Sequence, residues 1–502
     1  MRSRTEILRT VTRAALFFTV VALAIYCGIK LRLWWYPASE PCRFHGDINN
    51  AWDQGSAVYL NAVMMQGDGQ PLRWRSFLHA YSARYEQVTS AAPDGQFDLD
   101  YPPARLFIMS LWVWHTRPQY VPFFFVAAKH AGPLLWIDTV AEGLGAILAF
   151  LVVQLVLRRA EAPARNWLAL LAALLLWFDP SVFGDRVWPQ WDAWVLPFYL
   201  GAAHLALHRR WLAAGACLGV GMMFKGQVLA TMAVFALWPL FQLRWRGVLD
   251  VLVGVACSAM TCASPWLVRT IGGWIFAILI LIALGFGVYY LPKRWRLTTA
   301  AGGVVVVLLV AGLAFGGTFA WWFVSFAYGA RHWLRLIVGT PNNLPALLAR
   351  FWGWRQDDVV FAAVTLRELL IGIYIVALVA CAFGLARADL RNDLRVLVAL
   401  ATPWVLMYAL MPQMHERYLY WGAALTALCA GVSLGATLLH VVLTIMSCVA
   451  MGTWLTRESQ WPEMHSFLRG VYPGSAWVVL LLAAMFLYLS LAPSRERPPR
   501  RG

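Results

Sequence analysis

The chain has 502 residues, of which 61% are hydrophobic and only 13% carry a charge, and its mean hydropathy is +0.61. A soluble domain with a polar surface does not reach these values, so the composition indicates a polytopic membrane protein. The net charge of +16 could suggest a nucleic-acid partner. However, the basic residues form no stripe with interleaved aromatic side chains, so nucleic-acid binding is not expected.

The first apolar run, residues 16–29, follows arginines at positions 2, 4, 9 and 13 and is not followed by a cleavage site of small residues. We therefore expect an uncleaved membrane anchor rather than a removed signal peptide. Basic residues gather on the cytoplasmic side of membrane proteins, so the N-terminus is predicted to be cytoplasmic. The other basic clusters fall at short breaks between apolar runs, near residues 158, 209, 244, 294, 391 and 497.

If every basic cluster marks the cytoplasmic side, the apolar runs between clusters cross the membrane in pairs. Windows of roughly 20 residues then give about fourteen spans. The fold class predicted is an all-α polytopic membrane protein with a single membrane domain over residues 1–502. The run 418–454 has no charged loop, and we divide it on length alone. The predicted spans are residues 13–35, 133–157, 166–177, 191–207, 211–224, 228–243, 248–268, 271–291, 297–319, 366–385, 394–411, 418–438, 439–454 and 477–491.

Two polar segments, residues 36–132 and 320–362, face outward on this topology. Because polar loops cannot lie in lipid, they are predicted to cap the mouth of the bundle. In the first segment, Pro102 and Pro103 precede the apolar run 104–114. This run is too short to span, so we expect it to lie in the membrane interface.

Cysteine spacing and phosphate-binding motifs do not indicate a cofactor. Seven of the eight cysteines lie in or beside apolar runs, and no CxxC or His/Cys ligand spacing occurs. Neither a disulfide framework nor a zinc site is therefore expected. The sequence has no GxGxxG or P-loop motif, which argues against a nucleotide-dependent pump.

Polar clusters of both charge signs lie where the apolar runs reach the predicted outer face. One such residue alone is more often a snorkelling or structural side chain. Several on one face of a membrane, where ionisable groups are costly, indicate a functional site. The clusters are Asp47, Asp100 with Tyr101, residues 179–192, residues 225–227, residues 331–335, and His415 to Arg417.

Five motifs follow one another along the chain: Gly46-Asp47, Asp100-Tyr101-Pro102-Pro103, Trp188-Pro189-Gln190, Lys225-Gly226-Gln227 and His415-Glu416-Arg417. Together they resemble the motif set of GT-C glycosyltransferases, from residue 1 to about residue 420. The resemblance is closest to the dolichyl-phosphate-glucose-dependent enzymes that extend the N-glycan lipid precursor and to mannosyltransferases related to the GPI-anchor pathway. Those glucosyltransferases carry a lysine where this chain has Arg417, and the arginine form is more similar to prokaryotic relatives.

The resemblance implies a GT-C-type bundle whose first outer loop, residues 36–132, bears interfacial helices and the catalytic aspartate. It further implies inverting transfer of a hexose, mannose or glucose, from a polyprenyl-phosphate sugar to a lipid-linked glycan, a protein or an envelope lipid. The site is expected on the outer face of a cytoplasmic (inner) membrane or on the lumenal face of the endoplasmic reticulum. No metal or other cofactor is expected.

Asp47 is the candidate general base. A sugar on a polyprenyl phosphate has a good leaving group, so its transfer to a hydroxyl needs a base but no general acid. Asp47 lies just after the first span, where a lipid-linked donor could enter. The alternative is that Asp47 caps a helix that begins near Asn49.

Cations beside the leaving phosphate stabilise the charge that it gains in the transition state. Lys225, His415 and Arg417 suit this role, with the arginines of residues 331–335 as alternates. Glu416 is expected to orient its neighbours or to pair with an arginine. Alternatively, a buried Glu416–Arg417 network only holds two spans together.

Asp98 and Asp100 form an Asp-x-Asp pair, which in other transferases holds a divalent ion. Side chains at i and i+2 of an extended strand point to opposite sides, so this pair is a poor chelate. Asp100 is expected instead to orient a neighbour or a substrate hydroxyl, or only to cap the Pro-Pro turn.

A secondary transporter and a structural or flippase-like scaffold are the alternative functions. Transporters usually show repeated halves and helices that break near the midplane, whereas no half of this sequence repeats the other. The side chains expected to bind donor or acceptor are Asp100, Tyr101, Arg105, Asp185, Gln190, Asp192, Lys225, Gln227, Arg331, His415, Glu416 and Arg417.

Overall fold

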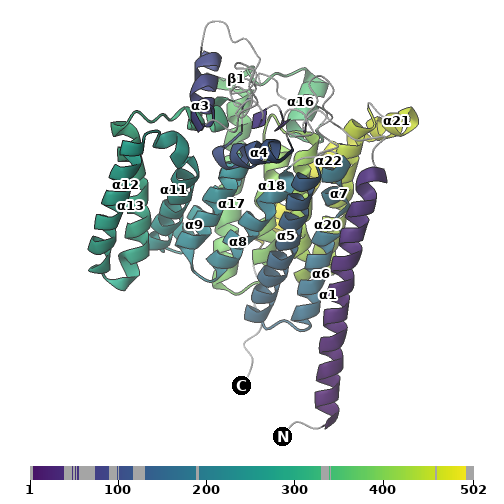
Figure 1. The fold of residues 1–502 in the computed structure, drawn as a ribbon. Helices are drawn as coiled ribbons and strands as arrows, with labels where there is room; N and C mark the ends of the chain where they lie inside the picture. Colours follow the sequence, from purple (N-terminus) through teal and green to yellow (C-terminus); the bar gives the residue numbers. More distant parts are fainter. Residues whose placement is uncertain are drawn as a thin grey trace.

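The computed structural model describes residues 4–38, 48, 51–52, 54–55, 74–89, 99, 101–116, 131–187, 191–328, 339, 341–457 and 461–492, and every structural statement below refers to them. They are almost entirely helical, and the long helices run side by side (Figure 1). The α-helices are α1 (Arg4–Ala38), α3 (Trp74–Thr89), α4 (Pro103–Thr116), α5 (Gly132–Arg159), α6 (Arg165–Trp177), α7 (Pro180–Val187), α8 (Val195–Leu207), α9 (Trp211–Phe224), α10 (Val228–Phe241), α11 (Trp245–Leu267), α12 (Ile271–Tyr289), α13 (Lys293–Ala314), α14 (Ala320–Trp322), α16 (Leu344–Trp352), α17 (Leu366–Leu390), α18 (Arg395–Leu410), α19 (Leu419–Thr426), α20 (Leu434–Leu455), α21 (Pro462–Val471) and α22 (Gly474–Leu491). The other elements are the 3-10 turns Asp192–Trp194, Glu416–Tyr418 and Ala427–Gly431, the π turn Phe323–Tyr328, and the antiparallel hairpin of β1 (Val359–Phe361) and β2 (Val364–Thr365).

Among the described residues, nine helical segments are long and apolar enough to cross a membrane, which confirms the prediction of an all-α polytopic membrane protein. Helices α9, α10 and α18 are apolar but have only 14, 14 and 16 residues. A full crossing needs about 20 residues. The predicted count of about fourteen spans is therefore not confirmed.

The predicted division of the run 418–454 between residues 438 and 439 is wrong. Helix α19 ends at Thr426, a 3-10 turn continues to Gly431, and α20 begins at Leu434. The Ser433 hydroxyl accepts a hydrogen bond from the backbone N–H of Ala436 and so caps α20. No charged residue marks this break, so the charge pattern could not place it.

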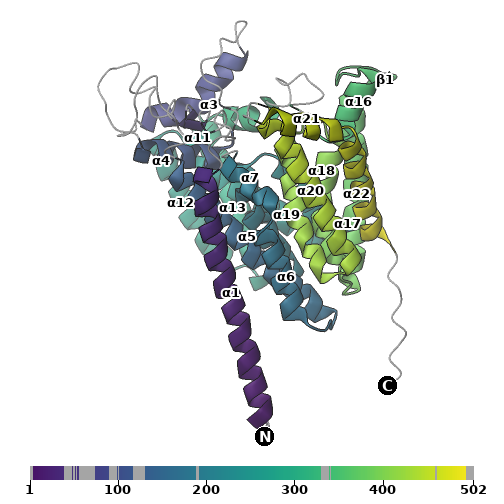
Figure 2. The same cartoon turned by 90° about the vertical axis from the view of Figure 1, so that its right-hand side faces the viewer.

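The bundle has two ends, which we call upper and lower as they appear in Figure 1. Helix α1 begins at the lower end, and α12 and α13 stand at the edge opposite to it (Figure 1). Helices α4 and α21 lie across the upper end in both views (Figures 1 and 2). Helix α4 contains the predicted interfacial run, and it is two-sided, with Leu106 and Met109 buried and Leu111 and Trp114 exposed.

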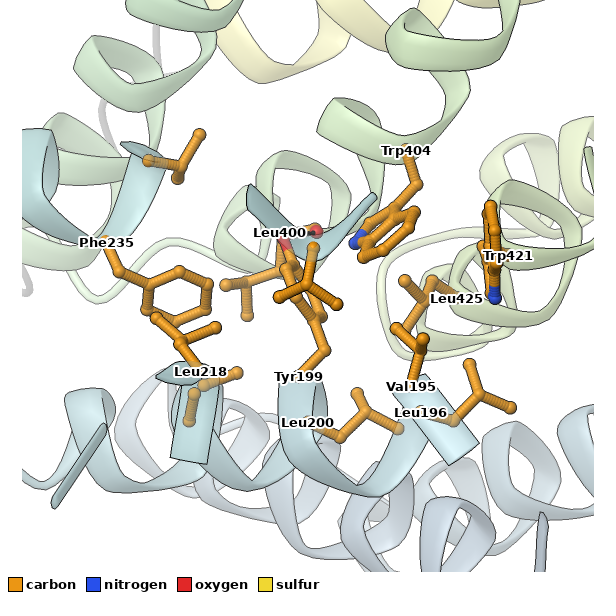
Figure 3. Close-up of a cluster of buried hydrophobic side chains, with 14 of the residues drawn as sticks. Val195, Leu196, Tyr199, Leu200, Leu218, Phe235, Leu400, Trp404, Trp421 and Leu425 are labelled. Carbon is orange, nitrogen blue, oxygen red and sulfur yellow. Dashed lines mark hydrogen bonds between the residues drawn. The ribbon is translucent and has the colours of Figure 1, made fainter. Parts of the chain in front are cut away.

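Tyr199 of α8 is fully buried in a cluster of apolar side chains from several helices (Figure 3). Its ring packs edge-on against Phe235 of α10 and Trp404 of α18, with centroids 5.3 and 5.5 Å away. Its hydroxyl donates a hydrogen bond of 2.8 Å to the carbonyl oxygen of Leu400, so this buried polar group is satisfied. Helix α8 is thereby fixed against both neighbours, and the position of its first turn is set.

A second buried group, the Asp389 carboxylate, joins the ends of α5, α8, α10 and α17. It accepts hydrogen bonds from Arg159 (3.2 Å), Arg209 (2.5 Å), Gln242 (2.7 Å) and Trp238 (3.0 Å). We call these five residues the Asp389 cluster. The carboxylate is 1% exposed, whereas the two arginine side chains are 26% and 30% exposed and keep contact with solvent.

Candidate functional site

At the opposite ends of α8 and α10, two predicted site residues meet around the carboxylate of a third, Asp192. Lys225 Nζ lies 2.5 Å from Asp192 Oδ1, and Arg417 Nε lies 3.4 Å from Asp192 Oδ2. The side chains of Lys225, Arg417 and Asp192 are 3%, 9% and 1% exposed, so both ion pairs are withdrawn from water. Each residue comes from a different part of the chain, and the packing of α8, α9 and α19 brings them together.

All three residues lie where a helix is interrupted. Asp192 begins the 3-10 turn before α8, and Arg417 lies in the 3-10 turn before α19. Lys225 ends α9 in an extended conformation, with φ −146° and ψ 115°. Gly226 follows it and passes close to the ring of Phe326, where a Cβ atom would lie 3.4 Å from a ring carbon. These interruptions let charged side chains leave the apolar helices and turn toward one another.

Two aromatic rings complete the surroundings of Lys225. Tyr418 and Trp421 stack with their centroids 4.9 Å apart, and the ammonium group lies 5.4 and 5.5 Å from the two centroids. The indole N–H of Trp421 donates to the backbone oxygen of Asp192 at 2.9 Å. This bond ties α19 to the turn that carries Asp192, and the ring faces stabilise the buried cation.

Arg105, in the first turns of α4, is fully buried beside this group. Its guanidinium carbon lies 3.2 Å from the ring centroid of Tyr101 and 4.2 Å from that of Trp191. None of its three side-chain nitrogens has a hydrogen-bond partner among the described residues. A buried charge without a hydrogen-bonding partner is costly, so this guanidinium is suited to bind an anion. We call Arg105, Asp192, Lys225 and Arg417 the Asp192 cluster.

The Asp192 cluster holds three basic side chains and one carboxylate. Lys225 lies in the turn between α9 and α10, and burial lowers its pKa to about 8. Asp192 opposes this shift by attracting the ammonium, while Arg105 and Arg417 add to it by repulsion. The excess positive charge and the burial of these side chains favour binding of a negatively charged group.

Glu416 and Arg417 are adjacent in sequence but contact different groups. Arg417 reaches Asp192, whereas Glu416 Oε2 lies 2.5 Å from Nδ1 of His415. The Glu416 carboxylate also packs against Gly339, whose φ is +72° and where a Cβ atom would lie 2.2 Å from Oε1. His415 packs edge-on against Trp454, with centroids 5.6 Å apart. Glu416 therefore positions His415 at the border of the Asp192 cluster.

The structure thus gathers Tyr101, Arg105, Asp192, Lys225 and Arg417, with His415 and Glu416 beside them. Gln227 is the N-cap residue of α10 and is half-buried. Asp185 belongs to α7, and its side chain is not described. The predicted residues outside the described part of the chain are Asp47, Asp98, Asp100, Gln190, Arg331 and Arg335.

The sequence analysis missed a buried charged network around Glu142 of α5. Arg32 Nε lies 2.5 Å from Glu142 Oε2, and Arg186 Nη1 pairs with Glu142 Oε1. One turn earlier in α5, the buried Asp138 lies near both Arg186 and Asp192 and so connects this network to the Asp192 cluster. Two carboxylates four residues apart inside a predicted span were the available signal, because such residues are rare in membranes.

The described residues contain no group of three His, Cys, Asp or Glu side chains that could hold a metal ion, and the seven cysteines among them are free thiols. Comparison of the chain with protein-family models and with curated proteins finds no match to either.

Proposed function

We propose that the protein is a membrane glycosyltransferase that moves a hexose, mannose or glucose, from a polyprenyl-phosphate sugar to an acceptor with inversion. The observation that carries the proposal is the Asp192 cluster. In it Lys225 and Arg417 pair with Asp192, and a third buried cation, Arg105, lies beside them with no hydrogen-bond partner among the described residues. A phosphate that gains charge as it leaves is the kind of group that such a cluster stabilises.

We assign a different role in phosphate binding to each side chain of the Asp192 cluster. The Arg105 guanidinium can donate to two phosphate oxygens at once, and its position between Tyr101 and Trp191 fixes its plane. Lys225 adds a point charge, and Asp192 holds Lys225 and Arg417 in position. Because all four side chains are nearly excluded from water, their fields are weakly screened.

In the proposed step, the acceptor hydroxyl oxygen forms a bond to the anomeric carbon while the bond from that carbon to the phosphate oxygen breaks. The electron pair goes to the phosphate, and the hydroxyl proton goes to a base. The Asp192 carboxylate is already engaged by Lys225 and Arg417, so we assign the base to another residue. Asp47, outside the described residues, is the proposed base. Side-chain cations supply the charge stabilisation, so we propose no metal.

We place the site on the non-cytoplasmic face, because the basic breaks between spans predict that both chain ends lie in the cytoplasm. On this proposal the membrane is a cytoplasmic (inner) membrane or that of the endoplasmic reticulum. The acceptor is a lipid-linked glycan, a protein or an envelope lipid.

A secondary transporter of an organic anion is the second candidate. The broken path from α19 to α20 favours it, since transporters bind substrate at discontinuous helices. The Asp192 cluster, however, lies at the ends of α8, α9 and α19 rather than halfway along them. This position suits a reaction at the membrane surface.

The test is to incubate the purified protein with synthetic polyprenyl-phosphate mannose or polyprenyl-phosphate glucose, in the presence of a membrane-lipid extract that supplies acceptor hydroxyls, and to measure the release of polyprenyl phosphate. We expect one donor to be consumed, and the Arg105→Gln variant to lose this activity. Absence of cleavage with both donors, together with sugar-anion uptake by proteoliposomes, would replace the transferase proposal with the transporter.

A further inference from the structure

Helices α11 and α13 begin, and α12 ends, at the lower end of the bundle (Figure 1). All three are candidate membrane spans, so their ends mark a boundary of the membrane. Residues 243–250 and 289–298, which we call the α11–α13 surface, hold one acidic side chain, Asp250, and five basic ones. The basic side chains are Arg244, Arg246, Lys293, Arg294 and Arg296.

Contacts between the first turns of α11 and α13 join the two segments into one surface. The guanidinium carbon of Arg246 lies 4.9 Å from the ring centroid of Trp295. Nearby, the Thr298 hydroxyl donates a hydrogen bond of 2.6 Å to the carboxylate of Asp250. The basic residues of both segments are thereby held side by side.

The basic side chains of this surface remain accessible. Arg244, Lys293 and Arg294 are exposed. Arg246 lies 3.8 Å from Asp250 but is still 42% exposed. Neither α11 nor α13 has an acidic residue in its first turn, where the helix dipole favours negative charge. These cations therefore do not serve to stabilise the helices, and they can bind an external anion.

Exposed aromatic side chains surround the cations. Trp245, Tyr289 and Tyr290 are 67%, 68% and 85% exposed. Arg296 lies with its guanidinium carbon 5.2 Å from the ring centroid of Tyr289 and donates to the backbone oxygen of Leu291 at 2.9 Å. Tryptophan and tyrosine are enriched at the level of the lipid head groups. The aromatic rings thus indicate that the cations lie at the depth of the head groups.

We propose that the α11–α13 surface binds the head groups of anionic phospholipids. The cations supply the attraction, and the position at the ends of three spans selects a lipid over a soluble anion. Gln242, a member of the Asp389 cluster, lies directly before this surface, which is therefore at the end of the bundle opposite to the Asp192 cluster. The surface is a separate site, and the inference does not rest on the transfer reaction.

The test is native mass spectrometry of the purified full-length protein with dioleoyl phosphatidylglycerol and with dioleoyl phosphatidylcholine, which has the same chains and no net charge. The test variant combines Arg244→Gln with Arg294→Gln and so removes one exposed cation from each segment of the surface. Its matched control combines Arg158→Gln with Arg165→Gln, two exposed arginines at the break between α5 and α6. Thermal unfolding of the three proteins checks that they fold alike.

We expect wild type to bind phosphatidylglycerol at least about tenfold more tightly than phosphatidylcholine, since several cations near the head group each contribute. The test variant should bind phosphatidylglycerol about tenfold more weakly than wild type, and the control variant should bind it within about threefold of wild type. Equal binding of the two lipids by wild type, or equal dissociation constants of phosphatidylglycerol for the two variants, would overturn the proposal.

Discussion

The Asp389 cluster and the Asp192 cluster both place basic side chains around one buried carboxylate, at opposite ends of α8 and α10. Asp389 accepts from four donors, and its two arginines remain 26% and 30% exposed. In the Asp192 cluster the lysine is 3% exposed and Arg105 is fully buried with no hydrogen-bond partner among the described residues. The first arrangement is a satisfied structural link between helices. The second contains a buried guanidinium without such a partner, as the proposed phosphate site requires.

The largest loss of transfer rate is expected from Asp47→Asn. This variant tests whether a reaction takes place at the end of the bundle that carries the Asp192 cluster. Loss of a positioned base typically lowers the rate by about 10²- to 10⁴-fold. Transfer by the purified variant should fall within this range while donor binding persists. Activity within a few-fold of wild type would exclude Asp47 as the base.

Arg105→Gln should lower the transfer rate by about 10²- to 10³-fold, the usual loss when one preorganised donor to a developing anion is removed. It should not lower the thermal stability of the ligand-free protein, because a buried charge without a hydrogen-bond partner is removed. Steady-state kinetics and thermal unfolding measure the two effects. A stability loss with unchanged kinetics would make Arg105 a structural residue.

Asp389→Asn should lower the stability of the protein and leave the transfer rate nearly unchanged, the reverse of the effects expected for Arg105→Gln. It leaves Arg159 and Arg209 without their carboxylate and should lower the free energy of unfolding by about 3 kcal/mol, near the low end for a broken buried pair, since both arginines can still be solvated. Unfolding in mixed micelles measures the change. Turnover per folded molecule should stay within a few-fold of wild type, and a selective loss of turnover would remove the distinction between the clusters.

The pH dependence of donor binding gives a smaller effect. Lys225 faces Asp192, Arg105 and Arg417, and its lowered pKa of about 8 means that it is charged below this pH and neutral above it. The affinity for a polyprenyl-phosphate sugar, whose phosphodiester charge does not change in this range, should fall about tenfold as pH rises through 8. Lys225→Arg stays charged and should remove this fall. A flat profile in wild type would contradict the role of Lys225.

The sequence predicts the helical bundle better than its interruptions. Long apolar runs between arginine-rich breaks correctly indicate α5, α11, α12 and α17. The break between α19 and α20 carries no charge, and only the capping Ser433 marks it. Local sequence cannot show such a break, because packing against neighbouring helices decides whether a short apolar helix continues.

For the candidate site, too, the sequence predicts some features and not others. Motif spacing and topology select Asp192, Lys225 and Arg417, but which cation meets which carboxylate depends on contacts between α8, α9 and α19 that no single segment encodes. Asp138 and Glu142 are missed because they lie within a 28-residue helix whose average hydropathy conceals two carboxylates. For Asp47 and Asp100, outside the described residues, the role rests on sequence alone.

The most direct test of the account is the dissociation constant of polyprenyl phosphate, measured at one pH and one salt concentration for wild type, Arg105→Gln and Arg209→Gln. Both substitutions remove one arginine that faces a buried carboxylate cluster, one at each end of the bundle. The account predicts at least about tenfold weaker binding for Arg105→Gln and an unchanged constant for Arg209→Gln. Equal constants for the two variants would contradict the assignment of the Asp192 cluster as the phosphate site.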